Sequence, residues 1–216
     1  MPAASNESVA IERGGVRGFL HVARGSKAGG IVLTHGAGGN CNAPLLVALA
    51  GAFSKAGVSV LRCDLPFRQK RPSGPPSPAS AAADRAGLRA AVEFLREMAP
   101  GAVYLGGQSY GGRQASMLAA EEPELTERLL LLSYPLHPPG KPTQLRTAHF
   151  PNLRTSAVFV HGTADPFGSI AELQSALTLI PAPTKLLPIE RAGHDLKRGR
   201  FDLAPVVLAA MARIGG

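Results

Sequence analysis

The middle of the chain reads Val103-Tyr-Leu-Gly-Gly-Gln-Ser-Tyr-Gly-Gly-Arg113, a short apolar run followed by glycines around a serine. Residues 107–111 form a G-x-S-x-G pattern. By itself this is a weak indicator, because 25 of the 216 residues are glycine. Its context adds weight, since an apolar strand precedes it and a helix-compatible segment begins at Arg113. Such a segment is typical of a sharp strand-to-helix turn that exposes a serine hydroxyl. We therefore interpret Ser109 as a candidate nucleophile, the alternative being a Gly-rich turn with a capping serine.

On both sides of this segment, apolar runs alternate with amphipathic ones. Two short runs flank Gly14-Gly15 and predict an antiparallel hairpin. The later strands are apolar on both faces, which indicates a mostly parallel sheet with helices on both sides. The segment 64–79 holds five prolines and is expected to be a surface loop. Strands are expected at 9–12, 16–23, 30–35, 58–63, 102–106, 129–133, 156–161 and 185–189, and helices at 43–55, 80–98, 113–121, 169–179 and 201–213, with at most one short helix near 143–149.

Partners for the serine are sought beyond the carboxyl ends of the strands, where functional groups gather in an open parallel sheet. A serine hydroxyl needs a base within hydrogen-bond reach, and His194 follows the last expected strand. Asp165 follows the strand before it and is the preferred acid, with Asp64 as the alternative. Asp84 lies near a helix start, where a capping or dipole role suffices. Activity is expected to fall as a histidine base, with a reference pKa of about 6.5, becomes protonated.

An oxyanion needs donors that are fixed in advance. The Tyr110 amide, directly after the serine, is one candidate. The other should come from the glycine-rich loop 35–39, with Ala37 preferred and Gly38 second. Gly38 and Gln108 are also expected to contact substrate. The same loop lacks the Gly-Lys-[Ser/Thr] ending of a phosphate-binding loop.

The chain is basic, with 23 Lys and Arg against 15 Asp and Glu and a net charge of +8. The basic groups at 68–71 and 197–200 each adjoin a single aromatic residue, so a base-stacking surface is not indicated and no nucleic-acid partner is expected. Arg68 is expected to border the site and favour anionic substrates, the alternative being a solvated loop.

No apolar run reaches the roughly 18 residues of a membrane span, so no membrane partner is expected. The N-terminus resembles no secretory signal and the two cysteines form no disulfide framework, so a cytoplasmic location is expected.

Five segments carry a resemblance to a known family: Thr34-His-Gly-Ala-Gly-Gly39, Gly106-Gly-Gln-Ser-Tyr-Gly-Gly-Arg113, Tyr134-Pro-Leu-His-Pro-Pro-Gly-Lys141, His161-Gly-Thr-Ala-Asp-Pro-Phe-Gly168 and Gly193-His194. In these the chain resembles the α/β-hydrolase superfamily, and specifically its compact dienelactone-hydrolase-like branch. The resemblance implies a three-layer α/β-hydrolase fold with a mostly parallel sheet of about eight strands and no metal or cofactor. The short interval between Ser133 and Ser156 leaves no room for a large cap domain. Dienelactone hydrolases proper use a cysteine nucleophile where this chain has Ser109.

We therefore expect one α/β-hydrolase domain over residues 1–216, a monomer or homodimer. The expected function is that of a serine hydrolase acting on a small or exposed ester or thioester through Ser109, His194 and Asp165. The alternative is a catalytically silent scaffold on the same fold that binds a protein or an acidic partner.

Overall fold

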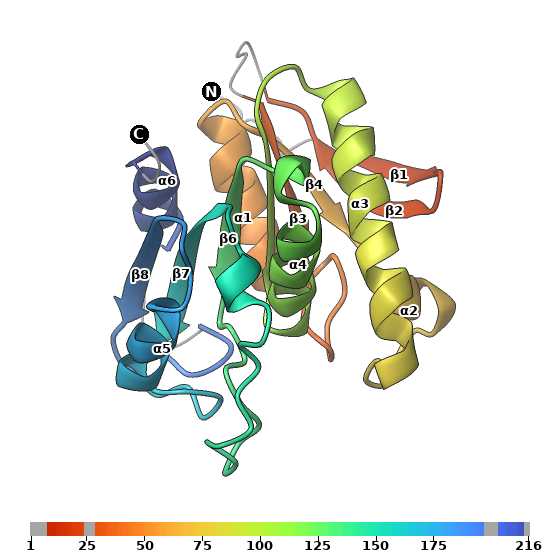
Figure 1. Cartoon of the computed structure of the whole chain (residues 1–216). Coiled ribbons are helices and arrows are strands. Elements are labelled where there is room, and N and C mark those ends of the chain that lie inside the picture. Colours follow the sequence, from red (N-terminus) through yellow and green to blue (C-terminus); the bar gives the residue numbers. More distant parts are fainter. Residues whose placement is uncertain (1–7, 24–28, 197–202, 214–216) are drawn as a thin grey trace.

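The chain is built around one sheet, shown in Figure 1 by a computed structural model that describes residues 8–23, 29–196 and 203–213. Its strand order is β1-β2-β4-β3-β5-β6-β7-β8. The β1–β2 and β2–β4 pairs are antiparallel and all the others are parallel. The strands are β1 (Val9–Arg13), β2 (Val16–His21), β3 (Gly30–Thr34), β4 (Ser59–Cys63), β5 (Val103–Gln108), β6 (Arg128–Leu132), β7 (Ser156–Gly162) and β8 (Thr184–Ile189). The expected α/β class, antiparallel hairpin and mostly parallel sheet are confirmed.

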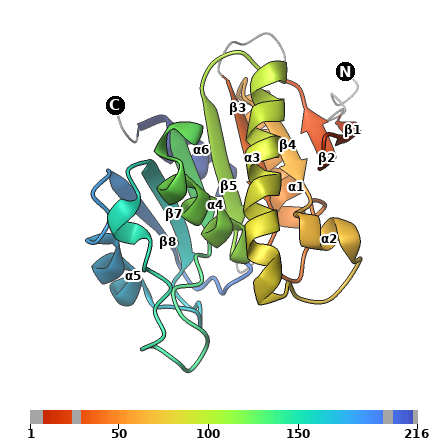
Figure 2. The same cartoon turned by 45° about the vertical axis from the view of Figure 1, so that its right-hand side comes forward.

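Helices cover both faces of the sheet and make three layers (Figures 1 and 2). One core cluster joins the sheet to α3, α4 and α5, and a second joins it to α1 and α6. Successive residues of a strand feed opposite clusters, as the two-residue period of a strand requires: Leu129 and Leu131 enter the first, Leu130 and Leu132 the second. The helices are α1 (Pro44–Lys55), α2 (Pro66–Lys70), α3 (Ala81–Met98), α4 (Tyr110–Glu121), α5 (Ile170–Leu177) and α6 (Leu203–Arg213).

The proline-rich segments differ from expectation. Residues 66–70 form the short helix α2, because Pro66 occupies the first helical turn, where a missing N–H costs nothing. Pro78 likewise begins a 3-10 turn that leads into α3. The single helical turn between β6 and β7 lies at Phe150–Asn152 rather than at 143–149. The basic group 197–200 and the start of the last expected helix, 201–202, lie outside the described residues.

No cap domain interrupts residues 133–155, all of which are described and which hold only that 3-10 turn. Within residues 8–23, 29–196 and 203–213, no helix combines the length and apolar character needed to cross a membrane.

Candidate active site

Ser109 lies alone between two elements, after β5 ends at Gln108 and before α4 begins at Tyr110. Its backbone has φ 50° and ψ −117°, a conformation that L residues rarely adopt and that the surroundings must hold in place. The Ser109 N–H donates to the Leu132 carbonyl at 2.8 Å. A Cβ at Gly111 would lie 2.4 Å from the His35 carbonyl oxygen, so only glycine permits α4 to approach β3 this closely. The expected strand-to-helix turn is thus present, with its strain at the serine.

The imidazole of His194 joins the other two predicted residues. Its Nε2 lies 2.8 Å from the Ser109 Oγ, and its Nδ1 lies 2.8 Å from the Asp165 Oδ2. Asp165 follows β7, and His194 follows β8. The Asp165 carboxylate is fully buried, and its second oxygen accepts from the Phe167 N–H at 2.9 Å. Phe167 also stacks on the imidazole, with 4.1 Å between centroids. Three side chains distant in the sequence thus form one hydrogen-bonded row.

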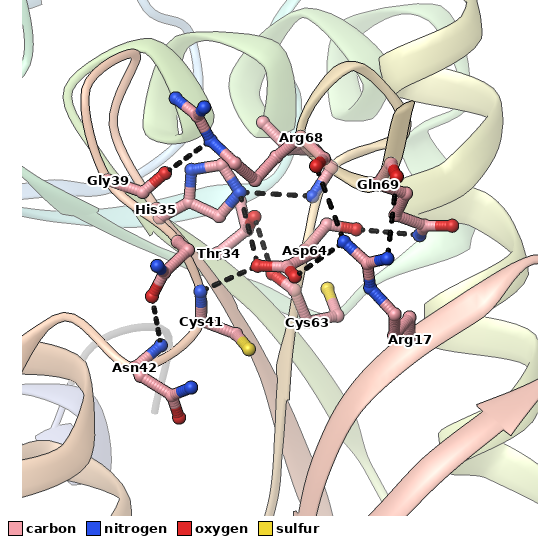
Figure 3. Close-up of polar contacts among 12 residues, drawn as sticks. Arg17, Thr34, His35, Gly39, Cys41, Asn42, Cys63, Asp64, Arg68 and Gln69 are labelled. Carbon is pink, nitrogen blue, oxygen red and sulfur yellow. Dashed lines mark hydrogen bonds and ion pairs between the residues drawn. The ribbon is translucent and has the colours of Figure 1, made fainter. Parts of the chain in front are cut away.

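Asp64, the alternative acid, serves another purpose (Figure 3). One carboxylate oxygen accepts from the Cys41 N–H at 2.7 Å and the other from Arg17 at 3.1 Å. It therefore fixes the segment after β3 and joins β2 to β4, while the acid in contact with His194 is Asp165.

The loop after β3 is oriented by the buried His35. Its Nε2 accepts from the Leu65 N–H at 3.1 Å, so its Nδ1 carries the proton and donates to the Gly36 carbonyl at 2.8 Å. Burial lowers the pKa of His35, which keeps this ring neutral. Because C=O and N–H point in opposite directions across a trans peptide, the Ala37 N–H is turned away from the His35 ring. Ala37 lies on the wall of a cavity shared with Ser109 and Tyr110.

Arg68 corrects an expectation. It is only 4% exposed, and its guanidinium turns inward instead of bordering the site as a free charge. It donates to the carbonyls of Ala37 and Gly39 at 2.9 and 2.8 Å, and to those of Arg71 and Gly74 at 3.2 and 2.9 Å. The Arg68 bond to Gly39 is visible in Figure 3. The side chain thus ties the loop after β3 to the proline-rich segment.

The cavity beside Ser109 holds about 570 Å³. Its walls combine apolar residues from the proline-rich segment with Phe167 and two arginines, Arg113 of α4 and Arg146 of the β6–β7 connection. Three described residues that were expected to contact substrate are not part of this lining: Gly38, Gln108 and Arg68. Sequence reasoning did not identify the two arginines. The only available signal for Arg113 was its position four residues after Ser109, at the start of the expected helix.

Asp84 is a second residue whose place the sequence did not reveal. It is fully buried, accepts from the Tyr110 hydroxyl at 2.7 Å and from the Phe67 N–H at 3.0 Å. It therefore fixes Tyr110, the residue after Ser109, to α2 and α3. Burial, and next the bond to Asp84, raises the pKa of Tyr110.

The thiols of Cys41 and Cys63 are free and buried. Burial raises the pKa of each to about 12, so neither thiol supplies a nucleophile at neutral pH. Among the residues that the structure describes, no group of three or more His, Cys, Asp or Glu side chains is arranged to hold a metal ion.

Solved structures share this fold. A dienelactone hydrolase from Anabaena variabilis is 23% identical, with 95% of this chain and 94% of that one covered and a TM-score of 0.71. Est1E from Butyrivibrio proteoclasticus is 16% identical, with 95% and 97% covered and a TM-score of 0.74. XC6422 from Xanthomonas campestris, described as a serine hydrolase without lid, is 17% identical, with 100% and 99% covered and a TM-score of 0.71.

The sequence also matches a family model described as an alpha/beta hydrolase domain, over residues 27–203. That range includes the strand-to-helix turn at Ser109 as well as Asp165 and His194. Since the match spans well over half of the chain, the protein belongs to the alpha/beta hydrolase domain family.

Proposed function

We propose that the protein is a serine hydrolase that cleaves a small or exposed ester or thioester through an acyl-enzyme intermediate. The observation that carries this proposal is the row Ser109–His194–Asp165, with 2.8 Å at each of its two contacts. A hydroxyl, an imidazole and a buried carboxylate in this order are what acyl transfer requires.

Each group has one task in the proposed reaction. The Ser109 Oγ forms a bond to the acyl carbon while its proton passes to the His194 Nε2. The imidazolium is stabilised by the Asp165 carboxylate and then gives the proton to the departing alkoxide or thiolate as the C–O or C–S bond breaks. A water molecule, deprotonated by His194, next attacks the acyl-enzyme, releasing the acid and restoring the Ser109 hydroxyl.

The amides of Ala37 and Tyr110 are proposed to stabilise the oxyanion. Both residues line the cavity beside Ser109, and neither amide requires a moving side chain. His35 and Arg68 hold the carbonyls around Ala37, while Asp84 holds the Tyr110 side chain. These contacts support a donor pair that is organised before substrate binds.

The open site supports a compact or exposed substrate. Residues 133–155 contain no cap domain that could cover the site. The cavity of about 570 Å³ lies in the usual size range for small ligands. One related structure contains ferulic acid bound to Est1E. Ferulate esters therefore belong in a first substrate panel, beside short-chain esters and thioesters.

A fluorophosphonate probe tests the proposal directly, because it labels only an activated serine. We expect labelling of the wild type, none of Ser109→Ala, and unchanged labelling of Ser77→Ala, which removes another serine hydroxyl from the same cavity lining. Hydrolysis of the ester panel should follow the same order. Folded wild-type protein that neither reacts with the probe nor cleaves any ester would refute the proposal and favour a silent scaffold.

A further inference from the structure

The cavity beside Ser109 has an unbalanced positive charge. The charged residues in its lining are Arg113 and Arg146, and no Asp or Glu belongs to that lining within the described part of the chain. No ion pair joins either guanidinium to a carboxylate among residues 8–23, 29–196 and 203–213. By contrast, the nearby Arg85 on α3 pairs with Glu121 at 3.0 Å. The site thus holds two cations that have no carboxylate counter-ion within the described part of the chain.

Arg113 has hydrogen-bonding capacity to spare. It is half-buried, and its Nε is fully buried with no acceptor among the described residues. The neighbouring Gln114, also part of the lining, has a second buried donor, Nε2, for which residues 8–23, 29–196 and 203–213 supply no acceptor. Unsatisfied buried donors are costly and call for an explanation. Among the described residues, both donors are available to an acceptor that enters the cavity.

Arg146 is presented by an anchored backbone. Its N–H donates to the Leu136 carbonyl at 2.8 Å, and its carbonyl accepts from the buried Tyr134 hydroxyl at 2.6 Å. Its guanidinium, in contrast, makes one long bond of 3.4 Å, to the Pro135 carbonyl. The backbone is thus fixed while most of the donors at the end of the side chain remain available.

The pKa values of neighbouring groups agree with an excess of positive charge at the cavity. The pKa of Arg146 is lowered by burial and then by the charge of Arg113. Burial, together with Arg113 and Arg85, lowers the pKa of His149 to about 4, so this ring is neutral near pH 7. The positive charge at the cavity therefore comes from guanidinium groups and persists across the physiological pH range.

Resting on the proposed function, we propose that Arg113 and Arg146 bind a carboxylate of the substrate, so that the preferred ester or thioester is a short anionic one. A guanidinium presents planar paired donors that match a carboxylate. The Arg113 N–H donates to the Ser109 carbonyl at 2.9 Å, and both residues line the same cavity. The carboxylate should accordingly lie only a few bonds from the scissile carbonyl. The anionic preference once expected from Arg68 is thereby assigned to other residues.

Matched ester pairs test this assignment. In the first pair the carboxylate is on the acyl side, as the 4-nitrophenyl monoester of adipic acid against its neutral methyl ester. In the second pair it is on the leaving group, as 4-acetoxybenzoate against its methyl ester. For each pair kcat/KM gives an anionic-to-neutral ratio, and we expect the wild type to favour the anion in at least one pair. That pair shows which side of the substrate carries the carboxylate.

Arg113→Gln and Arg146→Gln should each lower that ratio roughly ten- to hundredfold, the usual worth of a hydrogen bond to a charged group. Lys141→Gln is the matched control, since it removes the same charge from the same β6–β7 connection at an exposed position outside the lining. Its ratio should remain that of the wild type. Ratios near one in both pairs, or ratios that the Arg variants leave unchanged, overturn the carboxylate site even if neutral esters are cleaved.

A binding measurement separates this inference from the proposed function. Adipate is titrated calorimetrically into Ser109→Ala and into Ser109→Ala combined with Arg113→Gln. Binding to the first that weakens at least tenfold in the second supports the anion site whether or not any ester is hydrolysed. If adipate does not bind, while the wild type cleaves neutral esters through Ser109, the proposed hydrolase activity is supported and the proposed carboxylate site is refuted.

Discussion

Replacing Arg68 with Met tests whether a buried guanidinium maintains the loop after β3. Met fills much of the space of the aliphatic stem but donates nothing, so four carbonyls, those of Ala37, Gly39, Arg71 and Gly74, lose their donor. A hydrogen bond from a charged group contributes about 1.5–3 kcal/mol, and these four are not additive because they share one side chain. Allowing for carbonyls that regain water, we expect unfolding free energy to fall by roughly 3–5 kcal/mol.

The kinetic effect of Arg68→Met follows from the Ala37 carbonyl. Without its 2.9 Å bond, the Ala37 carbonyl is released and the neighbouring Ala37 N–H, the proposed oxyanion donor, is less firmly fixed. Complete loss of one such donor typically lowers kcat by about 10²–10³-fold. Because His35 still binds the Gly36 carbonyl, a smaller loss of about 10–100-fold is expected.

Urea denaturation and ester hydrolysis would be compared with Lys70→Met, which removes an exposed positive charge from the same helix α2. Arg68→Lys should resemble Arg68→Met, because one ammonium cannot reach four dispersed carbonyls. A stable Arg68→Met protein with wild-type kcat would refute this reasoning.

Three further outcomes are expected. Gly111→Ala should lower the thermal midpoint strongly or abolish folding, since its Cβ would lie 2.4 Å from the His35 carbonyl oxygen; an unchanged midpoint would contradict the close approach. Iodoacetamide should leave Cys41 and Cys63 unmodified in the native protein at pH 8, as read by mass spectrometry, because both thiols have a pKa of about 12; rapid native alkylation would count against this. Acidification should destabilise the wild type between pH 6.5 and 4, where the unfolded chain binds a proton that His149, with a folded pKa of about 4, does not; His149→Gln should lose roughly 2 kcal/mol less across that range, measured by urea denaturation.

Local patterns predicted most of the architecture, because strand and helix formation depend on nearby residues. The turn at Ser109 is an example: glycines around it, an apolar run before it and a helix after it all lie within a few residues. His194 and Asp165 were predicted from their order after the last two parallel strands, a consequence of sheet topology.

What the sequence did not reveal depends on contacts between distant segments. Arg68 in a proline-rich stretch is typical of a solvated loop, yet its acceptors at Ala37 and Gly39 lie about thirty positions earlier, a separation that no local pattern encodes. Asp84 looked like an ordinary helix-start carboxylate, since nothing nearby predicts that Tyr110 would reach it. The helix α2 was missed because prolines were counted as breakers, although Pro66 occupies a position that tolerates one.

Phe167 bears on any attempt to alter substrate scope by laboratory evolution. The same ring forms part of the cavity wall and lies against the His194 imidazole, and its backbone N–H binds the carboxylate that holds that imidazole. Enlarging the pocket at this position would therefore release one side of the histidine as well. Selections for bulkier acyl groups should find Phe167 variants poor starting points, and Pro75 and Pro76, which line the same cavity from the proline-rich segment, should be the more productive place to diversify.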